Sequence, residues 1–140
     1  MRVAVGHAAR RRPGRALAPL PGLPGGPRGP LTLLLGHLLA PGTAQALGKE
    51  LVAARGWGDD QFACLLSLWN QESGWRVNAA NRSSGAYGIP QALPGSKMAS
   101  VGADWQTNPA TQITWGLNYI GGRYGNPCGA WAHHESAGWY

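Results

Sequence analysis

Glu72 is the residue whose type and setting could do chemistry. Four apolar side chains upstream of it recur at i, i+3, i+4 and i+7, the spacing of one helix face: Phe62, Leu65, Leu66 and Trp69. At about 100° per residue, Glu72 lies roughly 70° from the centre of that face, at the edge between core and solvent. Partial burial and the negative end of the helix dipole both raise the pKa of a carboxyl group there. A raised pKa suits a general acid near neutral pH, and the alternative is a surface carboxylate at a helix end.

Glu72 also opens a series of motifs. They are Glu72–Trp75, residues 79–84, Gly85–Pro94, Thr107–Ile113 and Gly116–Ile120. Their order and spacing resemble the catalytic domain of the soluble-lytic-transglycosylase (SLT) type within the lysozyme-like superfamily. The resemblance covers about residues 57–140, and the short chain with two cysteines looks like the secreted transglycosylase-like domains of actinobacteria.

The resemblance implies roles for individual residues. Glu72 would be the catalytic acid and later the base, while Gln91 with Ser83 and Ser84 would line the subsite for N-acetylmuramic acid (MurNAc). Ile89 stands where the family has an apolar residue against the sugar. Further substrate-binding residues are expected among the aromatic side chains and histidines of the groove, namely Tyr87, Tyr119, Trp131 and His133.

Several of these positions have a second interpretation. Trp75, Tyr87, Trp105 and Trp131 could stack on sugar rings, because aromatic rings offer an apolar face with a polar edge, or could pack in the core. The family ends on an aromatic residue followed by Asn-Ala-Gly, which places a tyrosine near the acid. This chain has Gly129–His134 instead, so Trp131 or His133 would fill that role, and His133 and His134 are expected on a surface near the groove.

The implied reaction needs one carboxylate. A glycosidase ordinarily uses two, but Asp59 and Asp60 lie at the other end of the Glu72 helix, roughly 18 Å away at 1.5 Å per residue. In a lytic transglycosylase the C6 hydroxyl of MurNAc attacks its own C1, and this internal nucleophile supplies the proximity effect. We therefore expect cleavage of the bond between MurNAc and N-acetylglucosamine (GlcNAc) in peptidoglycan, leaving a 1,6-anhydro end. The alternatives are a non-catalytic peptidoglycan- or chitin-binding module, and a muramidase that uses water with a carboxylate such as Asp104.

The charge of +6 belongs to the first third of the chain. Residues 1–48 hold six arginines and no acid, residues 49–140 hold six basic and six acidic residues, and all aromatic residues lie between Trp57 and Tyr140. We predict a basic leader over residues 1–46 and a transglycosylase-like domain over 47–140. A ten-residue apolar run, Leu31–Ala40, precedes Pro41-Gly42 and an Ala44-Gln45-Ala46 triplet, a pattern typical of a secretory signal cleaved after Ala46, although a basic leader without export is the alternative.

The same distribution bears on location and partners. The run is too short to span a bilayer, and the arginines lie in the leader, so we expect no nucleic-acid partner and no stable membrane insertion. We expect a monomer that is secreted to the cell wall. No cofactor is expected, and the absence of a CxxC or Cys/His cluster argues against a metal site. In an exported protein Cys64 and Cys128 would pair, whereas in a reducing compartment they would be free thiols.

The expected fold is mainly α. Helices are predicted over Leu47–Arg55, from an Asp59 or Asp60 cap to Ser73, from Asn108-Pro109 to about Tyr124, and over Pro127–Glu135. Residues 74–107 are rich in Gly, Asn, Ser and Pro and should be irregular, with one helical turn near Ser96–Ser100. An irregular segment of this length inside a small domain is typical of a loop that builds a site, here the sugar groove of a lysozyme-like domain.

Overall fold

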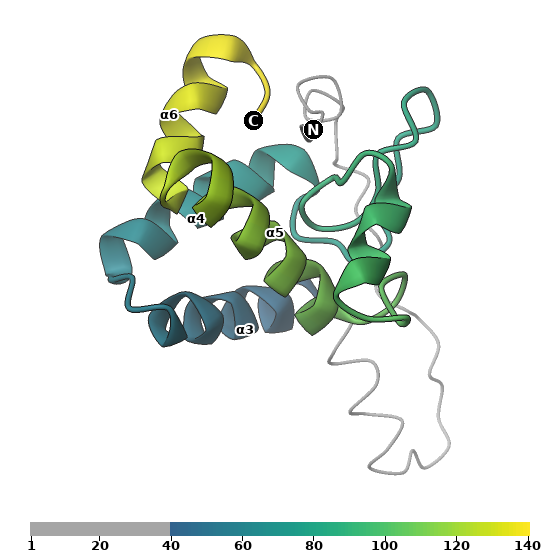
Figure 1. The fold of residues 1–140 in the computed structure, drawn as a ribbon, viewed down its shortest axis with the longest axis horizontal. Coiled ribbons are helices and arrows are strands. Elements are labelled where there is room, and N and C mark those ends of the chain that lie inside the picture. The colour runs from purple at the N-terminus through teal and green to yellow at the C-terminus, as the bar shows by residue number, and fades with distance from the viewer. Residues whose placement is uncertain (1–39) are drawn as a thin grey trace, which may run out of the picture.

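Helices dominate the part of the chain that the computed structural model describes, residues 40–140. The α-helices are α3 (Pro41–Ala54), α4 (Asp59–Glu72), α5 (Pro109–Tyr124) and α6 (Pro127–Ala137), with a 3-10 helix, η1 (Gly95–Ser100), between α4 and α5 (Figure 1). Within these residues strand-like pairing is limited to isolated bridges from Tyr87 to Ala80 and to Ala92. The mainly α prediction is therefore confirmed.

Asparagine and proline set the starts of the last two α-helices. The Asn108 side chain accepts a hydrogen bond from the Ala110 N–H, and Pro109 occupies the first turn, where its missing N–H is harmless. Asn126 caps α6 in the same way by accepting from the Gly129 N–H at 2.8 Å. These local signals explain why both starts could be predicted from the sequence.

Two helix starts differ from the prediction. α3 begins at Pro41 and not at Leu47, because a proline in the first turn opens a helix as readily as it breaks one. The N-cap of α4 is Gly58, so the prediction that Asp59 or Asp60 caps it is wrong. Both aspartates lie in its first turn, where a negative charge interacts favourably with the helix dipole.

The core lies between the α-helices, where α3 and α6 each pack against both α4 and α5. α4 contributes Leu65, Leu68 and Trp69, all fully buried. Gly116 of α5 lies directly against Trp69, since a Cβ there would be 2.5 Å from Cζ2 of the indole. This glycine makes room for the Trp69 indole against α5.

The irregular segment between α4 and α5 lies to one side of the helices, on the right in Figure 1. The buried side chain of Gln112 ties it to α5. Its Oε1 accepts from the Ile89 N–H at 2.9 Å, while its Nε2 donates to the carbonyls of Val77 at 3.0 Å and Trp105 at 2.8 Å. Gly88 leaves room for this amide, because a Cβ there would be 2.7 Å from Oε1 of Gln112. One amide thus holds three separate points of the loop.

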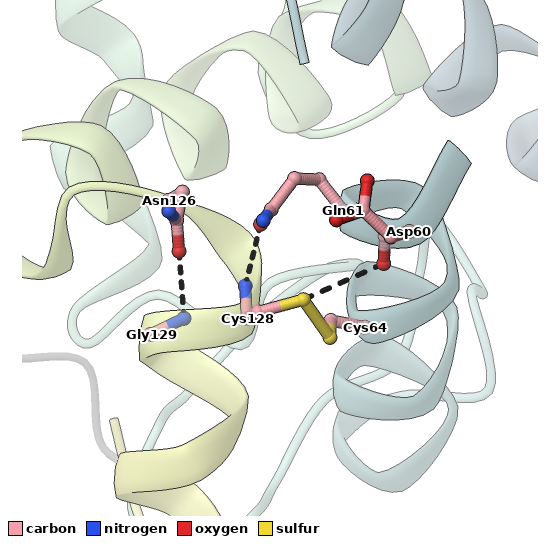
Figure 2. The surroundings of a disulfide bond; sticks show 6 residues. All are labelled: Asp60, Gln61, Cys64, Asn126, Cys128 and Gly129. Carbon is pink, nitrogen blue, oxygen red and sulfur yellow. Dashed lines mark hydrogen bonds between the residues drawn. A yellow bond between two sulfur atoms is a disulfide. The ribbon is translucent and has the colours of Figure 1, made fainter. Parts of the chain in front are cut away.

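Cys64 and Cys128 form a disulfide that joins α4 to the start of α6 (Figure 2). Beside it, Gln61 of α4 accepts from the Cys128 N–H at 2.9 Å. The Cys128 sulfur lies 3.4 Å from the Asp60 carbonyl oxygen, a contact without a hydrogen bond because a disulfide sulfur carries no proton. The pairing expected for an exported protein is present, and it fixes α6 against α4.

The predicted leader lies almost wholly outside the described residues. The predicted cleavage position after Ala46 falls inside α3, and Ala44, on the leader side of it, is fully buried in the core. The folded part therefore extends at least to Pro41. Among the helices of residues 40–140, none is long and apolar enough to cross a bilayer.

Candidate active site

Glu72 is the last residue of α4, and its side chain has no exposed surface. The sequence placed it at the edge between core and solvent, but α6 covers that edge, so the carboxyl is more buried than expected. Neither of its oxygens has a hydrogen-bond partner among residues 40–140. An ionised carboxylate is strongly disfavoured in such surroundings. Burial accordingly raises the pKa of Glu72 well above its ordinary value.

His134 of α6 is the neighbour of this carboxyl. Its Nδ1 lies 3.6 Å from Oε2 of Glu72, and the His134 side chain is 9% exposed. Trp131, one turn earlier on α6, stacks on the imidazole with ring centroids 5.6 Å apart. The expectation that His134 lies on a surface is wrong, because the side of α6 that carries His134 packs against α4.

Tyr140 closes the same region from the end of the described chain. Its hydroxyl accepts a hydrogen bond from Nε1–H of Trp69 at 2.8 Å and donates to the Pro90 carbonyl at 2.8 Å. Burial raises the pKa of Tyr140 well above its ordinary value, and the Glu72 carboxylate raises it further. Tyr140 is thus a tyrosine that interacts electrostatically with the candidate acid, whereas the sequence suggested Trp131 or His133 as the residue near it.

The loop that carries Ile89 and Gln91 is fastened to the end of α4. The Ser73 hydroxyl donates to the Ile89 carbonyl at 2.7 Å, next to Glu72 in the chain. Gln91 adopts a positive φ of 57° and donates from Nε2 to the carbonyls of Ala79 at 3.1 Å and Gly88 at 3.0 Å. A non-glycine residue in that conformation is uncommon and is held by its surroundings. Both side chains are buried, so in this conformation they support the loop.

Aromatic contacts connect further predicted residues to the acid. Tyr119 lies 5.9 Å from Tyr140 between ring centroids and stacks on Trp115 at 5.5 Å. His133 lies 5.2 Å from the ring of Tyr124 and 4.5 Å from that of Trp139. Tyr119 therefore contacts Tyr140 and Trp131 contacts His134, whereas His133 contacts Tyr124 and Trp139.

Ser83, Ser84 and Tyr87 belong to a different part of the loop. The N–H groups of Ser83 and Ser84 donate to Oδ1 of Asn81 in an exposed turn. Tyr87 donates its hydroxyl hydrogen to the Gln106 carbonyl at 2.9 Å and packs edge-on against Trp105. The described contacts thus link Ile89, Tyr119 and Trp131 to residues next to Glu72. Gln91 is held by the loop carbonyls of Ala79 and Gly88, and Ser83, Ser84 and Tyr87 lie in the outer part of the loop.

The core interpretation holds for Trp75, which is fully buried. Its ring packs edge-on against Trp69 at 5.1 Å and Phe62 at 6.3 Å. Trp105 is half-buried against Tyr87, as described above. Stacking on a sugar thus remains open for Trp105 but not for Trp75 in this conformation.

Other carboxylates lie elsewhere. Asp104 is exposed and accepts from Asn108 Nδ2 at 2.8 Å and Thr111 Oγ1 at 2.7 Å, which lowers its pKa. Asp59 and Asp60 lie at the opposite end of α4, and Glu135 is exposed on α6. In residues 40–140 no group of three or more His, Cys, Asp or Glu side chains is placed to hold a metal ion.

Two residues near the acid were missed by sequence reasoning as parts of the site, His134 and Tyr140. His134 sits beside His133, and only the turn of α6 decides which of the two faces Glu72. Tyr140 follows Gly138, whose positive φ of 86° ends α6 and turns the chain back toward the core. An aromatic residue after a helix-ending glycine was the one signal that could have pointed to it.

No protein-family model, curated protein or solved structure matches this chain.

Proposed function

We propose that this protein is a peptidoglycan lytic transglycosylase with Glu72 as its general acid and base. The observation that carries the proposal is a buried carboxyl at a helix end, whose pKa burial raises well above its ordinary value and whose oxygens have no hydrogen-bond partner among the described residues. The motif resemblance from Glu72 to Ile120 supports the same assignment and names the glycan.

The chemistry follows from the protonated carboxyl. Glu72 gives its proton to the oxygen between MurNAc and GlcNAc as the bond from C1 to that oxygen breaks. The C6 hydroxyl of the same MurNAc then bonds to C1, and its proton returns to Glu72. The products are a 1,6-anhydroMurNAc end and a free GlcNAc hydroxyl, with no net consumption of protons or water.

The proposal requires the glycan to displace part of the cover over Glu72, since the carboxyl has no exposed surface in the free protein. Tyr119 contacts Tyr140 and Trp131 stacks on His134, and both side chains are half-buried. Their aromatic faces would be offered to sugar rings. Residues of the loop fastened to α4 by Ser73, including Gln91, would then complete the subsite. We further propose that the chain is a monomer secreted to the cell wall. The disulfide supports the export part of this proposal, since disulfides persist in oxidising compartments.

Muropeptide analysis tests the proposal. Purified peptidoglycan is digested with the wild type and with Glu72→Gln, and the products are weighed by mass spectrometry. We expect wild-type products lighter by one water than those of a hydrolytic muramidase, and none from Glu72→Gln. Hydrated reducing ends would instead identify a muramidase.

A non-catalytic binding module is the second candidate, and the complete burial of Glu72 is the observation in its favour. The same pair of proteins separates the two. If the protein is a binding module, the wild type and Glu72→Gln should sediment with insoluble peptidoglycan to the same extent, and neither should release muropeptides.

A further inference from the structure

The fold brings an imidazole from one helix against the candidate acid of another. Nδ1 of His134 on α6 lies 3.6 Å from Oε2 of Glu72 on α4. The disulfide between Cys64 and Cys128 and the packing of α6 on α4 fix the relative position of the two helices. The pair is therefore a product of tertiary structure and is held on two rigid elements.

The orientation of the imidazole is set from its own helix. Trp131 stacks on the ring with an interplanar angle of 17°, so the indole covers one face of the imidazole. Stacking occupies a face of the ring, and the Nδ1 edge lies toward Oε2 of Glu72. A small movement of either side chain would shorten the 3.6 Å separation to a hydrogen bond.

We propose that His134 is a positioning residue for Glu72. Its Nδ1–H donates a hydrogen bond to Oε2 of Glu72 whenever the carboxyl has lost its proton. This inference rests on the function proposed above. Oε2 then faces His134, and Oε1 is left to exchange the proton with the glycan. A buried carboxylate without a donor is strongly disfavoured, so a donor at this position stabilises the state between the two proton transfers.

The proton count stays balanced. Oε1 releases a proton to the bridging oxygen as the bond to C1 breaks, and it receives the proton of the C6 hydroxyl as the new bond to C1 forms. His134 keeps its Nδ1 proton throughout and changes only the strength of one hydrogen bond.

Other titratable or charged groups lie on the segments that adjoin or pack against the pair. They are Arg76 after α4, Tyr119, Arg123 and Tyr124 on α5, His133 and Glu135 on α6, and Tyr140. Among them Tyr140 is the group whose pKa the Glu72 carboxylate raises. His134 is the residue whose ring nitrogen lies beside the carboxyl, so its replacement should have the larger effect on the titration of Glu72.

Carbon-13 NMR of the glutamate carboxyl carbons tests the inference without relying on activity. The chain holds three glutamates, Glu50, Glu72 and Glu135, so Glu72→Gln assigns the signal of Glu72 by difference. His134→Leu removes the donor at similar volume and should move the Glu72 titration midpoint upward by about one pH unit. His134→Asn places an amide nitrogen near the position of Nδ1 and should restore the wild-type midpoint. A midpoint that stays or falls in His134→Leu overturns the inference.

His133→Leu is the matched control for the midpoint, because the His133 ring contacts Tyr124 and Trp139 instead of Glu72. It should leave the Glu72 signal where it is in the wild type. In muropeptide release, His134→Leu should lower kcat by roughly tenfold or more with little change in KM, and His134→Asn should recover most of it. Unchanged kcat in His134→Leu overturns the positioning role, whereas a wild type that releases no muropeptides overturns the proposed function itself, whatever the NMR midpoint does.

Discussion

The indole of Trp69 donates a hydrogen bond to the hydroxyl of Tyr140 across 71 residues of chain, at 2.8 Å, and both side chains are fully buried. The same hydroxyl donates to the Pro90 carbonyl. One oxygen therefore joins α4, the loop after it and the C-terminal segment.

Tyr140→Phe should destabilise the protein by about 1–3 kcal/mol. The change leaves the ring in place but removes the partner of a buried donor on Trp69 and of a buried acceptor on Pro90, and unsatisfied buried groups carry about that cost. Urea unfolding followed by tryptophan fluorescence measures it. Tyr124→Phe is the control, since the Tyr124 hydroxyl has an exposed hydrogen bond from Arg123, and it should change stability by less than about 0.5 kcal/mol. Equal midpoints for the two variants would contradict the structural role of Tyr140.

Gly116→Ala should destabilise the protein by about 1–3 kcal/mol, because the new Cβ would lie 2.5 Å from the fully buried Trp69 ring and overpack the core. Gly122→Ala lies in the same helix with nothing within 4 Å of the new Cβ, and it should gain up to about 1 kcal/mol from helix propensity. Thermal unfolding of both variants by circular dichroism compares them. Opposite signs are expected, and a Gly116→Ala variant as stable as the wild type would mean that the Trp69 ring can move away from α5 without loss of stability.

Removal of the disulfide by the double change Cys64→Ala and Cys128→Ala should cost about 2–5 kcal/mol, since the bridge restricts the unfolded chain over a separation of 64 residues. The folded form should keep its helical circular dichroism spectrum, because α4 and α6 still pack through apolar contacts. A urea midpoint equal to that of the wild type would rule out a stabilising role for the bridge.

Glu72 should make the protein less stable as the pH rises. Its folded pKa is raised, so the folded state retains a proton that the unfolded state loses near pH ~4.3. The stability that Glu72 contributes is therefore fully present below that pH and is lost as the pH rises through the folded pKa. Glu72→Gln carries no such proton and should be more stable than the wild type at about pH 8 to 9, with the difference vanishing toward about pH 4.

Urea unfolding at a series of pH values checks this prediction, and the difference between the two proteins isolates Glu72. Asp104 has a lowered pKa and acts in the opposite direction at lower pH, but it is present in both proteins and cancels. Parallel curves would show that Glu72 has the same pKa in the folded and unfolded states, which would also remove the basis for a general acid.

The helices could be predicted from the sequence because their signals are local. The apolar period before Glu72, the Asn-Pro starts of α5 and α6 and the Gly- and Pro-rich segment between α4 and α5 are set by residues a few positions apart. The predicted start of α3 was wrong for the same reason, because a proline can either end a helix or occupy the first turn of one.

The surroundings of Glu72 were decided by tertiary structure alone. Its distance along the apolar face predicted a position at the edge of the core, but whether that edge is open depends on α6, whose packing is not encoded next to Glu72. The choice of His134 over His133, and the return of Tyr140 to Trp69, likewise follow from how helices far apart in the chain meet. Local sequence fixes which residue can carry a proton, and long-range packing fixes how dry that residue is and what lies beside it.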